Sequence, residues 1–296
     1  ASIEGFSKFG SYTGNGSANG PIVNTGFEPA FLMVKGSSNS GSWLIFDNKR
    51  NTTNPRTKIL YADSDISETT NANIKVDFLS NGFQLTGTDT DYNGSGRTYI
   101  YMAFAADPSS SAPVLPDSFA NKLYTGNGGT QSITGLGFQP DFVWLKSSSA
   151  TWGNFLQDSI RGAENFLISE SSAAQGTTVP AIVDSFDTDG FTVLANGNSN
   201  ELNTTYVSWN WKANSVPTIN TDGTIQSLVS ANANSGFSIV KWDGTGAINT
   251  VGHGLSAAPE MILIKDLDSA SDWQVYHTSI GNGNKLVLNS TAAQSS

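Results

Sequence analysis

The chain has 296 residues, of which 38% are hydrophobic, and this content is enough for several small cores in a globular protein. The formal net charge of −10, with only 15 lysines and arginines, argues against a nucleic-acid partner and against anionic membranes. The absence of cysteine excludes disulfide scaffolds, thiolate metal sites and cysteine nucleophiles, and no apolar run approaches the roughly 18 to 20 residues that membrane insertion needs.

One short sequence motif occurs near the start of three segments of the chain. Residues 12–16 (YTGNG) return as residues 124–128 (YTGNG) and, more loosely, as residues 242–246 (WDGTG). Each copy is followed by a Gly-Phe or Gly-Leu pair, a proline and an apolar run that ends in a lysine. These lysines are Lys35, Lys146 and Lys265, which lie 111 and then 119 positions apart. A unit of this length can bury its own core, so we expect tandem domains over residues 1–107, 108–215 and 216–296.

The third copy matches the second up to Gln294, the counterpart of Gln175, and the chain ends two residues later. The second copy continues through a hairpin and an apolar strand to Ala213, and the third copy has neither. A sandwich without them would leave sheet edges unpaired and a hydrophobic face in water. We therefore expect two complete repeats and one partial repeat, completed by further polypeptide or by a neighbouring chain.

Short apolar runs bounded by Gly, Asn, Ser and Pro recur along the chain, which is typical of all-β sandwiches. Residues 31–34, 142–145 and 261–264 are too short for helices and predict central strands covered on both faces. Second strands are expected at residues 43–46, 155–156 and 273–276. Alternating residues around Asn81-Gly82 and Asp189-Gly190 predict hairpins with type I′ turns.

Aromatic strands at residues 99–105 and 206–213 are expected to close the two complete repeats. The linkers at residues 107–113 and 214–217 contain proline and are short, so they predict a semi-rigid string of domains, each around its own core. The fold class is therefore all-β, with tandem antiparallel β-sandwiches.

The phrase from residues 12–16 through Gly26-Phe27 and Pro29 to residues 99–105 resembles repeated domains of structural proteins in tailed bacteriophages, especially marine ones. Residues 137–146, Asp158, Arg161-Gly162 and residues 206–213 carry the same resemblance in the second copy. It implies a concanavalin-like sandwich on a virion surface, outside the cell, in a tail fibre or related appendage. Partners would then be other virion proteins, copies of this chain in a homo-oligomer, or a host-surface glycan or receptor.

Two charged pairs recur at the end of the second strand: Asp47 with Arg50, and Asp158 with Arg161. Each pair is either a polar ligand clamp or an ion pair that anchors a loop, and the loop anchor is the commoner role of such pairs. The third copy has His277 at the aspartate position and no arginine.

Trp43, Trp152 and Trp273 are placed at equivalent positions beside Ser/Asn/Gly loops. An exposed indole there could stack on a sugar ring. Repetition of the residue favours core packing instead, and burial of all three would remove the support for a sugar platform.

Residues 89–94 (DTDYNG) match the first half of a calcium loop, with Asp89, Asp91 and Asn93 at alternate positions. The acid expected at the twelfth position is Ile100, so an EF-hand is excluded. A looser structural calcium site and ordinary turn residues both remain open, and no other cofactor is expected.

The only histidines, His253 and His277, lie in the partial copy, so a repeated hydrolytic triad is excluded. No pair of carboxylates recurs in all copies either, so we expect no enzyme. Together with the resemblance described above, this implies a non-enzymatic virion protein for host attachment. The alternatives are a secreted or surface carbohydrate-binding module and, less favoured, a polysaccharide depolymerase.

Overall fold

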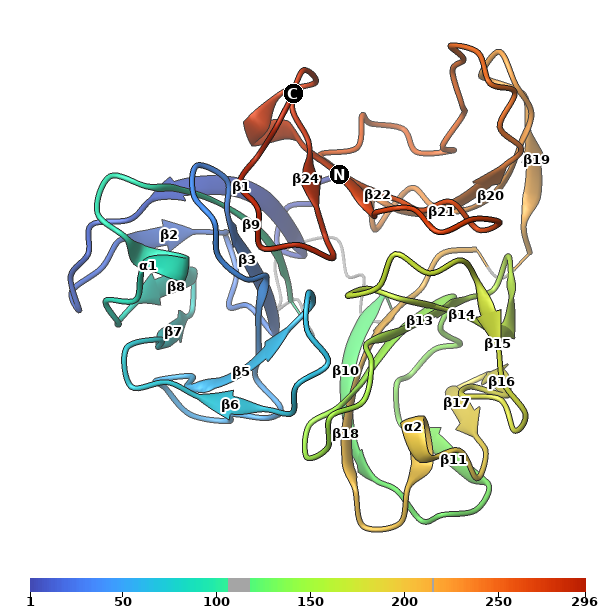
Figure 1. Cartoon of the computed structure of the whole chain (residues 1–296), viewed down its shortest axis with the longest axis horizontal. Coiled ribbons are helices and arrows are strands. Elements are labelled where there is room, and N and C mark those ends of the chain that lie inside the picture. The colour runs from blue at the N-terminus through green and yellow to red at the C-terminus, as the bar shows by residue number, and fades with distance from the viewer. Residues whose placement is uncertain (106–117, 215) are drawn as a thin grey trace.

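The computed structural model describes residues 1–105, 118–214 and 216–296. The expected first linker, residues 107–113, lies outside the described residues, as does residue 215 of the second. Antiparallel strands dominate throughout, and the all-β prediction is confirmed. Three lobes follow one another in chain order around a common centre (Figure 1). We call them repeat 1, repeat 2 and repeat 3.

Repeat 1 contains a six-stranded sheet in the order β1-β9-β3-β4-β5-β6 and a three-stranded sheet in the order β2-β8-β7. A single helical turn, α1 (Thr90–Asn93), precedes the closing strand β9. The strands are β1 (Ser7–Thr13), β2 (Ile22–Asn24), β3 (Phe31–Gly36), β4 (Leu44–Asp47), β5 (Lys58–Tyr61), β6 (Thr69–Thr70), β7 (Val76–Leu79), β8 (Gly82–Leu85) and β9 (Thr98–Phe104).

Repeat 2 has the same topology, with sheets β10-β18-β12-β13-β14-β15 and β11-β17-β16. Its helical turn is α2 (Gly197–Asn200). The strands are β10 (Phe119–Thr125), β11 (Gln131–Thr134), β12 (Phe142–Ser147), β13 (Phe155–Asp158), β14 (Gly162–Ile168), β15 (Gly176–Thr177), β16 (Ser185–Asp187), β17 (Gly190–Val193) and β18 (Thr205–Trp211).

Repeat 3 is built differently, from two three-stranded sheets in the orders β19-β20-β21 and β22-β23-β24. By sequence, β21 corresponds to β1 and β10, and β22 corresponds to β3 and β12. The elements are β19 (Thr218–Asn220), β20 (Ser227–Asn232), β21 (Phe237–Trp242), β22 (Met261–Ile264), β23 (Gln274–His277), the 3₁₀ turn η1 (Thr278–Ile280) and β24 (Leu286–Val287).

Both predicted hairpins form, between β7 and β8 and between β16 and β17. The predicted type I′ geometry is wrong, because Asn81 and Asp189 do not adopt positive φ, whereas Gly82 and Gly190 do, at 154° and 157°. Each glycine begins a strand beside the carbonyl of a paired strand. A Cβ there would lie 2.0 Å from the Val23 oxygen or 1.8 Å from the Ile133 oxygen, so close strand approach requires glycine.

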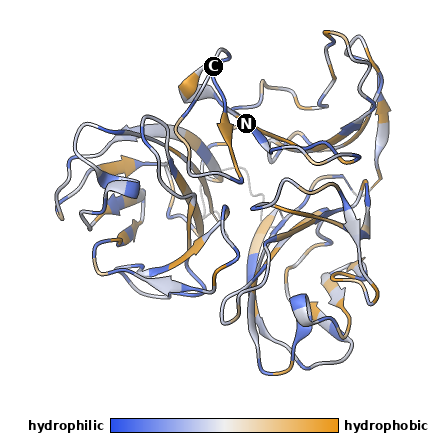
Figure 2. Ribbon diagram, viewed as in Figure 1, coloured by the Kyte–Doolittle hydropathy of each residue, from blue (hydrophilic) through white to orange (hydrophobic). Residues whose placement is uncertain are grey.

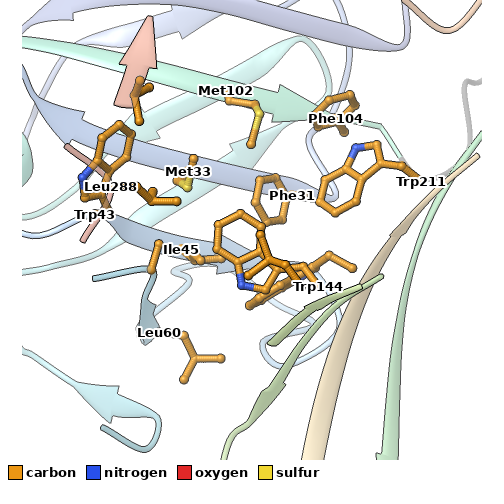
Figure 3. Close-up of a cluster of buried hydrophobic side chains, with 14 of the residues drawn as sticks. Phe31, Met33, Trp43, Ile45, Leu60, Met102, Phe104, Trp144, Trp211 and Leu288 are labelled. Atoms are coloured by element: carbon orange, nitrogen blue, oxygen red, sulfur yellow. The ribbon is translucent and has the colours of Figure 1, made fainter. Parts of the chain in front are cut away.

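Each complete repeat has a private core between its two sheets, formed around residues such as Leu32 and Phe83 in repeat 1 and Val143 and Phe191 in repeat 2. A further cluster joins all three repeats (Figure 3). The following buried residues belong to this shared core: Phe6, Ala30, Phe31, Met33, Trp43, Ile45, Leu60, Ala62, Ile100, Met102, Phe104, Phe119, Trp144, Leu156, Leu167, Val207, Trp209, Trp211, Trp273, Val275, Ile280, Leu286 and Leu288.

The expectation of separate domains on a string is therefore wrong. Central strands such as β3 are buried on both faces, as predicted, but the second face packs against the other repeats. Phe31 of repeat 1, for example, packs edge-to-face on Trp209 of repeat 2, with ring centroids 5.5 Å apart. A two-sided apolar strand meets the same burial requirement whether a sheet of its own domain or a neighbouring domain covers it.

Equivalent main-chain hydrogen bonds close the three repeats into a ring. The Glu68 N–H of repeat 1 donates to the Ser148 oxygen of repeat 2 at 2.8 Å. The counterparts run from Gln175 to Leu267, at 3.0 Å, and from Gln294 back to Ser37, at 2.9 Å. The ring thus has a cyclic, heterologous pattern within one chain, as in a three-subunit assembly. Figure 2 shows hydrophobic strands such as β22 and β24 toward the centre and hydrophilic turns such as α1 and α2 at the outside.

Candidate binding surfaces and the interfaces between repeats

Two of the three predicted tryptophan platforms lie in the shared core. Trp43 and Trp273 are 1% and 4% exposed. The Trp43 Nε1–H donates to the Val287 oxygen of repeat 3 at 3.0 Å, and the Trp273 Nε1–H donates to the Ile168 oxygen of repeat 2 at 2.9 Å. A sugar cannot reach these indole faces, so the ligand-binding assignment of Trp43 and Trp273 is wrong.

Trp152 is not the counterpart of these residues. Asn154 occupies the equivalent position, and its Nδ2 donates to the Tyr61 oxygen of repeat 1 at 3.0 Å. One side-chain donor in each repeat thus binds the carbonyl at the end of the third strand, β5, β14 or β24, in the preceding repeat. Trp152 is a tryptophan near the equivalent position, but it lies two residues before that position. The constant spacing to Lys35, Lys146 and Lys265 identifies Asn154.

Trp152 itself is half-buried on the surface loop before β13. Its Nε1–H lies 3.3 Å from Oε2 of Glu201, and its ring lies near Gly197 at the start of α2. Of the three predicted tryptophans it alone keeps an accessible part, and the repeats offer no equivalent second platform at this position.

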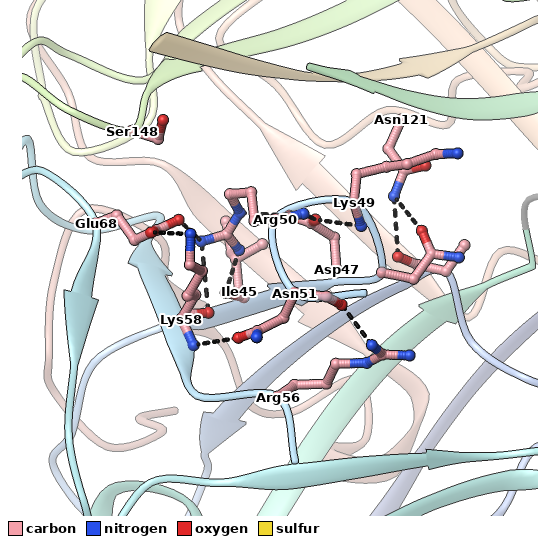
Figure 4. Close-up of polar contacts among 12 residues, drawn as sticks. Ile45, Asp47, Lys49, Arg50, Asn51, Arg56, Lys58, Glu68, Asn121 and Ser148 are labelled. Carbon is pink, nitrogen blue, oxygen red and sulfur yellow. Dashed lines mark hydrogen bonds and ion pairs between the residues drawn. The ribbon is translucent and has the colours of Figure 1, made fainter. Parts of the chain in front are cut away.

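The Asp–Arg pairs anchor turns at the interfaces between repeats, and Figure 4 shows the pair of repeat 1. Asp47 accepts hydrogen bonds from the Arg50 N–H at 2.8 Å and from Arg50 Nε at 2.5 Å. Arg50 also donates from Nη2 to the Ile45 oxygen at 3.0 Å and lies 3.3 Å from the Glu68 carboxylate. These four contacts occupy both groups, so the loop-anchor interpretation accounts for Asp47.

Asp158 and Arg161 reproduce this arrangement in repeat 2. The Arg161 N–H donates to Asp158 Oδ1 at 2.9 Å, the Arg161 Nε bonds Asp158 Oδ2, and Nη2 donates to the Leu156 oxygen at 2.9 Å. Both side chains are almost fully buried. The prediction that Asp47, Arg50, Asp158 and Arg161 clamp a ligand is therefore wrong for the aspartates and for Arg161. Arg50 alone also borders a groove described below.

His277 performs the turn-capping part of this role in repeat 3. Its Nδ1 accepts from the Ser279 N–H at 3.1 Å, and its Nε2 lies 3.3 Å from the Tyr101 oxygen of repeat 1. Acceptance at Nδ1 and donation from Nε2 require the neutral ring. Burial lowers the pKa of His277 and thereby favours the neutral ring. Ile280 replaces the arginine and packs into the shared core.

Two fully buried lysines, whose role could not be predicted from the sequence, hold the ring together. The Lys35 ammonium donates to the oxygens of Gly36, Thr291 and Ala292, the last two in repeat 3. The Lys146 ammonium donates to the oxygens of Asp65 in repeat 1 and Trp152. Burial lowers the pKa of each ammonium to about 8. A lysine that ends an apolar strand in every repeat was the available signal.

Lys265 differs, because it is only partly buried and its ammonium reaches the Asp266 oxygen of its own loop at 2.8 Å. The lysine side chain at this position therefore bonds to a neighbouring repeat in repeats 1 and 2 but not in repeat 3.

The predicted calcium residues serve local structure. Asp89 caps α1 by accepting from the Asp91 N–H at 2.9 Å. Asn93 is fully buried and donates to the oxygens of Ser17 and Gly87. Within the described residues no three His, Cys, Asp or Glu side chains are placed to hold a metal ion. The Asn93 side chain is thus used inside the fold, and the turn interpretation accounts for the contacts of Asp89 and Asn93.

A groove of about 410 Å³ lies between repeats 1 and 2. Its charged side comes from Arg50, Lys58 and Glu68, where Lys58 Nζ lies 3.0 Å from Glu68. Its other side comes from repeat 2, with Tyr124 and the exposed Leu123. The remaining lining residues are Thr125, Ser148, Ser149, Thr205 and Tyr206. Charged residues and residues with hydroxyl groups line this groove, as they do in sites for polar ligands.

Comparison with known proteins gives one match. A family model described as a domain of unknown function, DUF7483, matches residues 1–108 and 116–296. No curated protein and no solved structure matches the chain. Across the described residues, none of the helices has the length and apolar character needed to cross a membrane.

Proposed function

This chain belongs to the DUF7483 family, and we propose that it is a non-enzymatic structural module of a bacteriophage virion. The module would be part of a tail fibre or related appendage and would hold loops toward the host surface. Its resemblance to repeated domains of phage structural proteins supports the assignment to a phage particle. The ring supports the mechanical role, because a core shared by three repeats resists bending between them.

The shared core is the observation that carries this proposal. Bulky aromatic side chains of repeats 1 and 2 interlock there, including Phe31, Phe104, Phe119 and Trp211, whose ring centroids lie 5.0 to 6.4 Å apart. Independent domains on flexible linkers would not need such a core, since each could bury its own apolar surface. The design therefore favours a fixed geometry over mobility.

The loops that follow the repeated phrase are the surfaces presented. Residues 15–19 and 241–248 are exposed throughout, and residues 127–130 are largely so. Residues 15–19 and 127–130 are rich in Gly, Asn, Ser and Thr, which suits adaptable hydrogen bonding, whereas residues 241–248 are more mixed and begin in β21. Three related loops on one rigid ring would allow weak contacts to add through multivalency.

Immunogold electron microscopy tests this proposal directly. Antibodies raised against the purified chain are applied to phage particles and to cells from the source. Gold on a tail or appendage supports the proposal. Gold confined to cell envelopes or to secreted material overturns it.

A carbohydrate-binding module is the second candidate, and the groove between repeats 1 and 2 is what favours it. The purified chain is tested on a glycan array beside the variant Leu123→Asp, which places a charge on an exposed groove position. Binding by the parent chain that is lost in the variant supports this function. Equal signals from both proteins exclude the groove as the glycan-binding site.

A further inference from the structure

The groove between repeats 1 and 2 has a charged wall on which the charges cancel. Asp47 neutralises Arg50 through their ion pair. The Glu68 carboxylate lies 3.3 Å from Arg50 Nη1 and 3.0 Å from Lys58 Nζ, so cations and carboxylates alternate along this row. Lys58 is its most accessible member, with 42% of the side chain exposed. Figure 4 shows the row and places Ser148 of repeat 2 across from Glu68.

The interface between repeats 2 and 3 has uncharged residues at two of these positions. Strand register makes Asn165 the counterpart of Lys58. The main-chain bonds between repeats make Gln175 the counterpart of Glu68. Gln175 Nε2 donates to Asn165 Oδ1 at 2.9 Å, and Arg161 Nη1 donates to Gln175 Oε1 at 3.4 Å. An amide pair thus supports the same turn, so the ring does not require charges at these positions.

Stability also gives little reason for the charges of Lys58 and Glu68, because a partly exposed ion pair stabilises a fold only weakly. The two residues line the groove instead. Contact with a ligand therefore explains the charged pair better than a structural role does.

The opposite wall, from repeat 2, is uncharged and polar. Thr125, Ser149 and Thr205 are exposed and line the groove beside Leu123, which is 41% exposed. Ser149 Oγ accepts the Thr205 N–H at 2.9 Å, and among the described residues its own hydroxyl hydrogen has no acceptor. This hydroxyl group can therefore donate to a ligand.

The two walls together favour an uncharged ligand that is rich in hydroxyl groups. A hydroxyl group can donate to the Glu68 carboxylate and accept from the Lys58 ammonium without separating the ion pair. A ligand carboxylate that approaches Lys58 would also approach Glu68, and like charges in contact are strongly unfavourable. The net charge of −10 disfavours anionic polymers at longer range as well.

We propose that the groove between repeats 1 and 2 binds an uncharged saccharide and that the Lys58–Glu68 pair excludes acidic sugars. The volume of about 410 Å³ is within the range of small-ligand sites, and the exposed Leu123 suits the apolar face of a sugar ring. This inference rests on the carbohydrate-binding candidate above, and it adds the class of saccharide and the residues that select it.

Array binding with matched probes tests the selection. The probes are immobilised oligosaccharides of glucose, galactose and mannose, and the same oligosaccharides oxidised at C6 to uronic acids. The parent chain is expected to bind a neutral probe at least about tenfold more tightly than its oxidised counterpart. In Glu68→Gln this ratio should fall at least about tenfold, because the repelling carboxylate is removed while Lys58 stays charged.

Two further variants control for the fold and for the net charge. Lys58→Asn with Glu68→Gln reproduces the amide pair of the interface between repeats 2 and 3, so the ring is retained, and weaker binding of the neutral probe is expected. Glu164→Gln removes one negative charge at an exposed position outside the groove and should leave the ratio unchanged. Near-ultraviolet circular dichroism checks that each variant is folded.

A preference for neutral probes that Glu68→Gln reduces and Glu164→Gln does not reduce supports the proposal. Equal binding of both probe forms, tighter binding of the oxidised form, or the same ratio in Glu68→Gln overturns it. An equal change in Glu164→Gln assigns the preference to net charge and overturns it too. In these cases, binding that Leu123→Asp abolishes still supports the carbohydrate-binding function. The absence of binding to every probe overturns both.

Discussion

Strands β3 and β22 have similar sequences and different surroundings. Residues 31–34 (FLMV) and 261–264 (MILI) are both continuous apolar runs after a proline, and both end near a lysine. β3 is buried along its whole length, whereas β22 alternates between half-buried and exposed residues. The apolar pattern determines that a strand can be enclosed, but the neighbouring strands and sheets determine whether it is enclosed. Repeat 3 contributes one face to the shared core and leaves the other open.

The charged turn gives the largest expected difference between the complete repeats and repeat 3. Asp158→Ala leaves Arg161 buried without its partner, which costs about 3 to 5 kcal/mol of the free energy of unfolding. His277→Asn keeps an oxygen acceptor for the Ser279 N–H and introduces no charge, so a loss of about 1 kcal/mol is expected. Denaturant unfolding of the two variants measures both values.

Asp158→Asn is the control for this experiment, since it retains the capping oxygen and removes only the charge. Equal losses for Asp158→Ala and His277→Asn would contradict the assignment of the ion pair as the stronger anchor.

A matched pair of core truncations comes next. Leu32→Ala removes a fully buried side chain and is expected to cost about 2 to 5 kcal/mol. Ile262→Ala, at the equivalent position of repeat 3, is expected to cost less than about 1 kcal/mol, because its side chain is already partly hydrated. Chemical denaturation compares the two variants. Similar costs would mean that Ile262 is covered in solution.

Acid should weaken the interface at His277. Its folded-state pKa lies below the ordinary value of 6.5, so the unfolded chain binds the proton first as the pH falls. This contribution to stability is present above pH 6.5 and is lost below it, by no more than about 1.4 kcal/mol per pH unit for one group. Thermal unfolding from pH 7 to 5 is compared between the parent chain and His277→Asn. Identical pH profiles would contradict the neutral, capping histidine.

The buried lysines should change the stability at alkaline pH rather than at acid pH. The folded-state pKa of Lys35 is about 8, below the ordinary 10.5, so between these values the unfolded state binds more protons. Stability should therefore rise with pH in this window, and Lys35→Met should flatten the rise. Lys265→Met, at the partly exposed position, is the matched control. If stability rises equally with pH in the parent chain and in Lys35→Met, deprotonation of Lys35 does not contribute to the pH dependence.

The repeats, their strands and the hairpins could be predicted because they depend on local patterns. Proline entries, short apolar runs and strand-starting glycines recur at nearly constant spacing. The fine geometry of the turns could not be predicted, since the requirement for Gly82 comes from the Val23 carbonyl on another strand. The candidate sites failed for a related reason. A recurring tryptophan or ion pair is compatible with a surface site and with an interface, and the sequence does not say which.

The amino-acid sequence by itself determined an all-β chain in which one strand pattern recurs three times, because strand periodicity and repetition are properties of neighbouring residues. The tertiary structure decided that the units share a core and close into a ring. That outcome depends on contacts between apolar faces that lie more than a hundred residues apart in the sequence. The hydrogen bond from Trp43 to the Val287 oxygen is one example. Burial of an apolar face is required by its sequence, but the partner that buries it is chosen by packing.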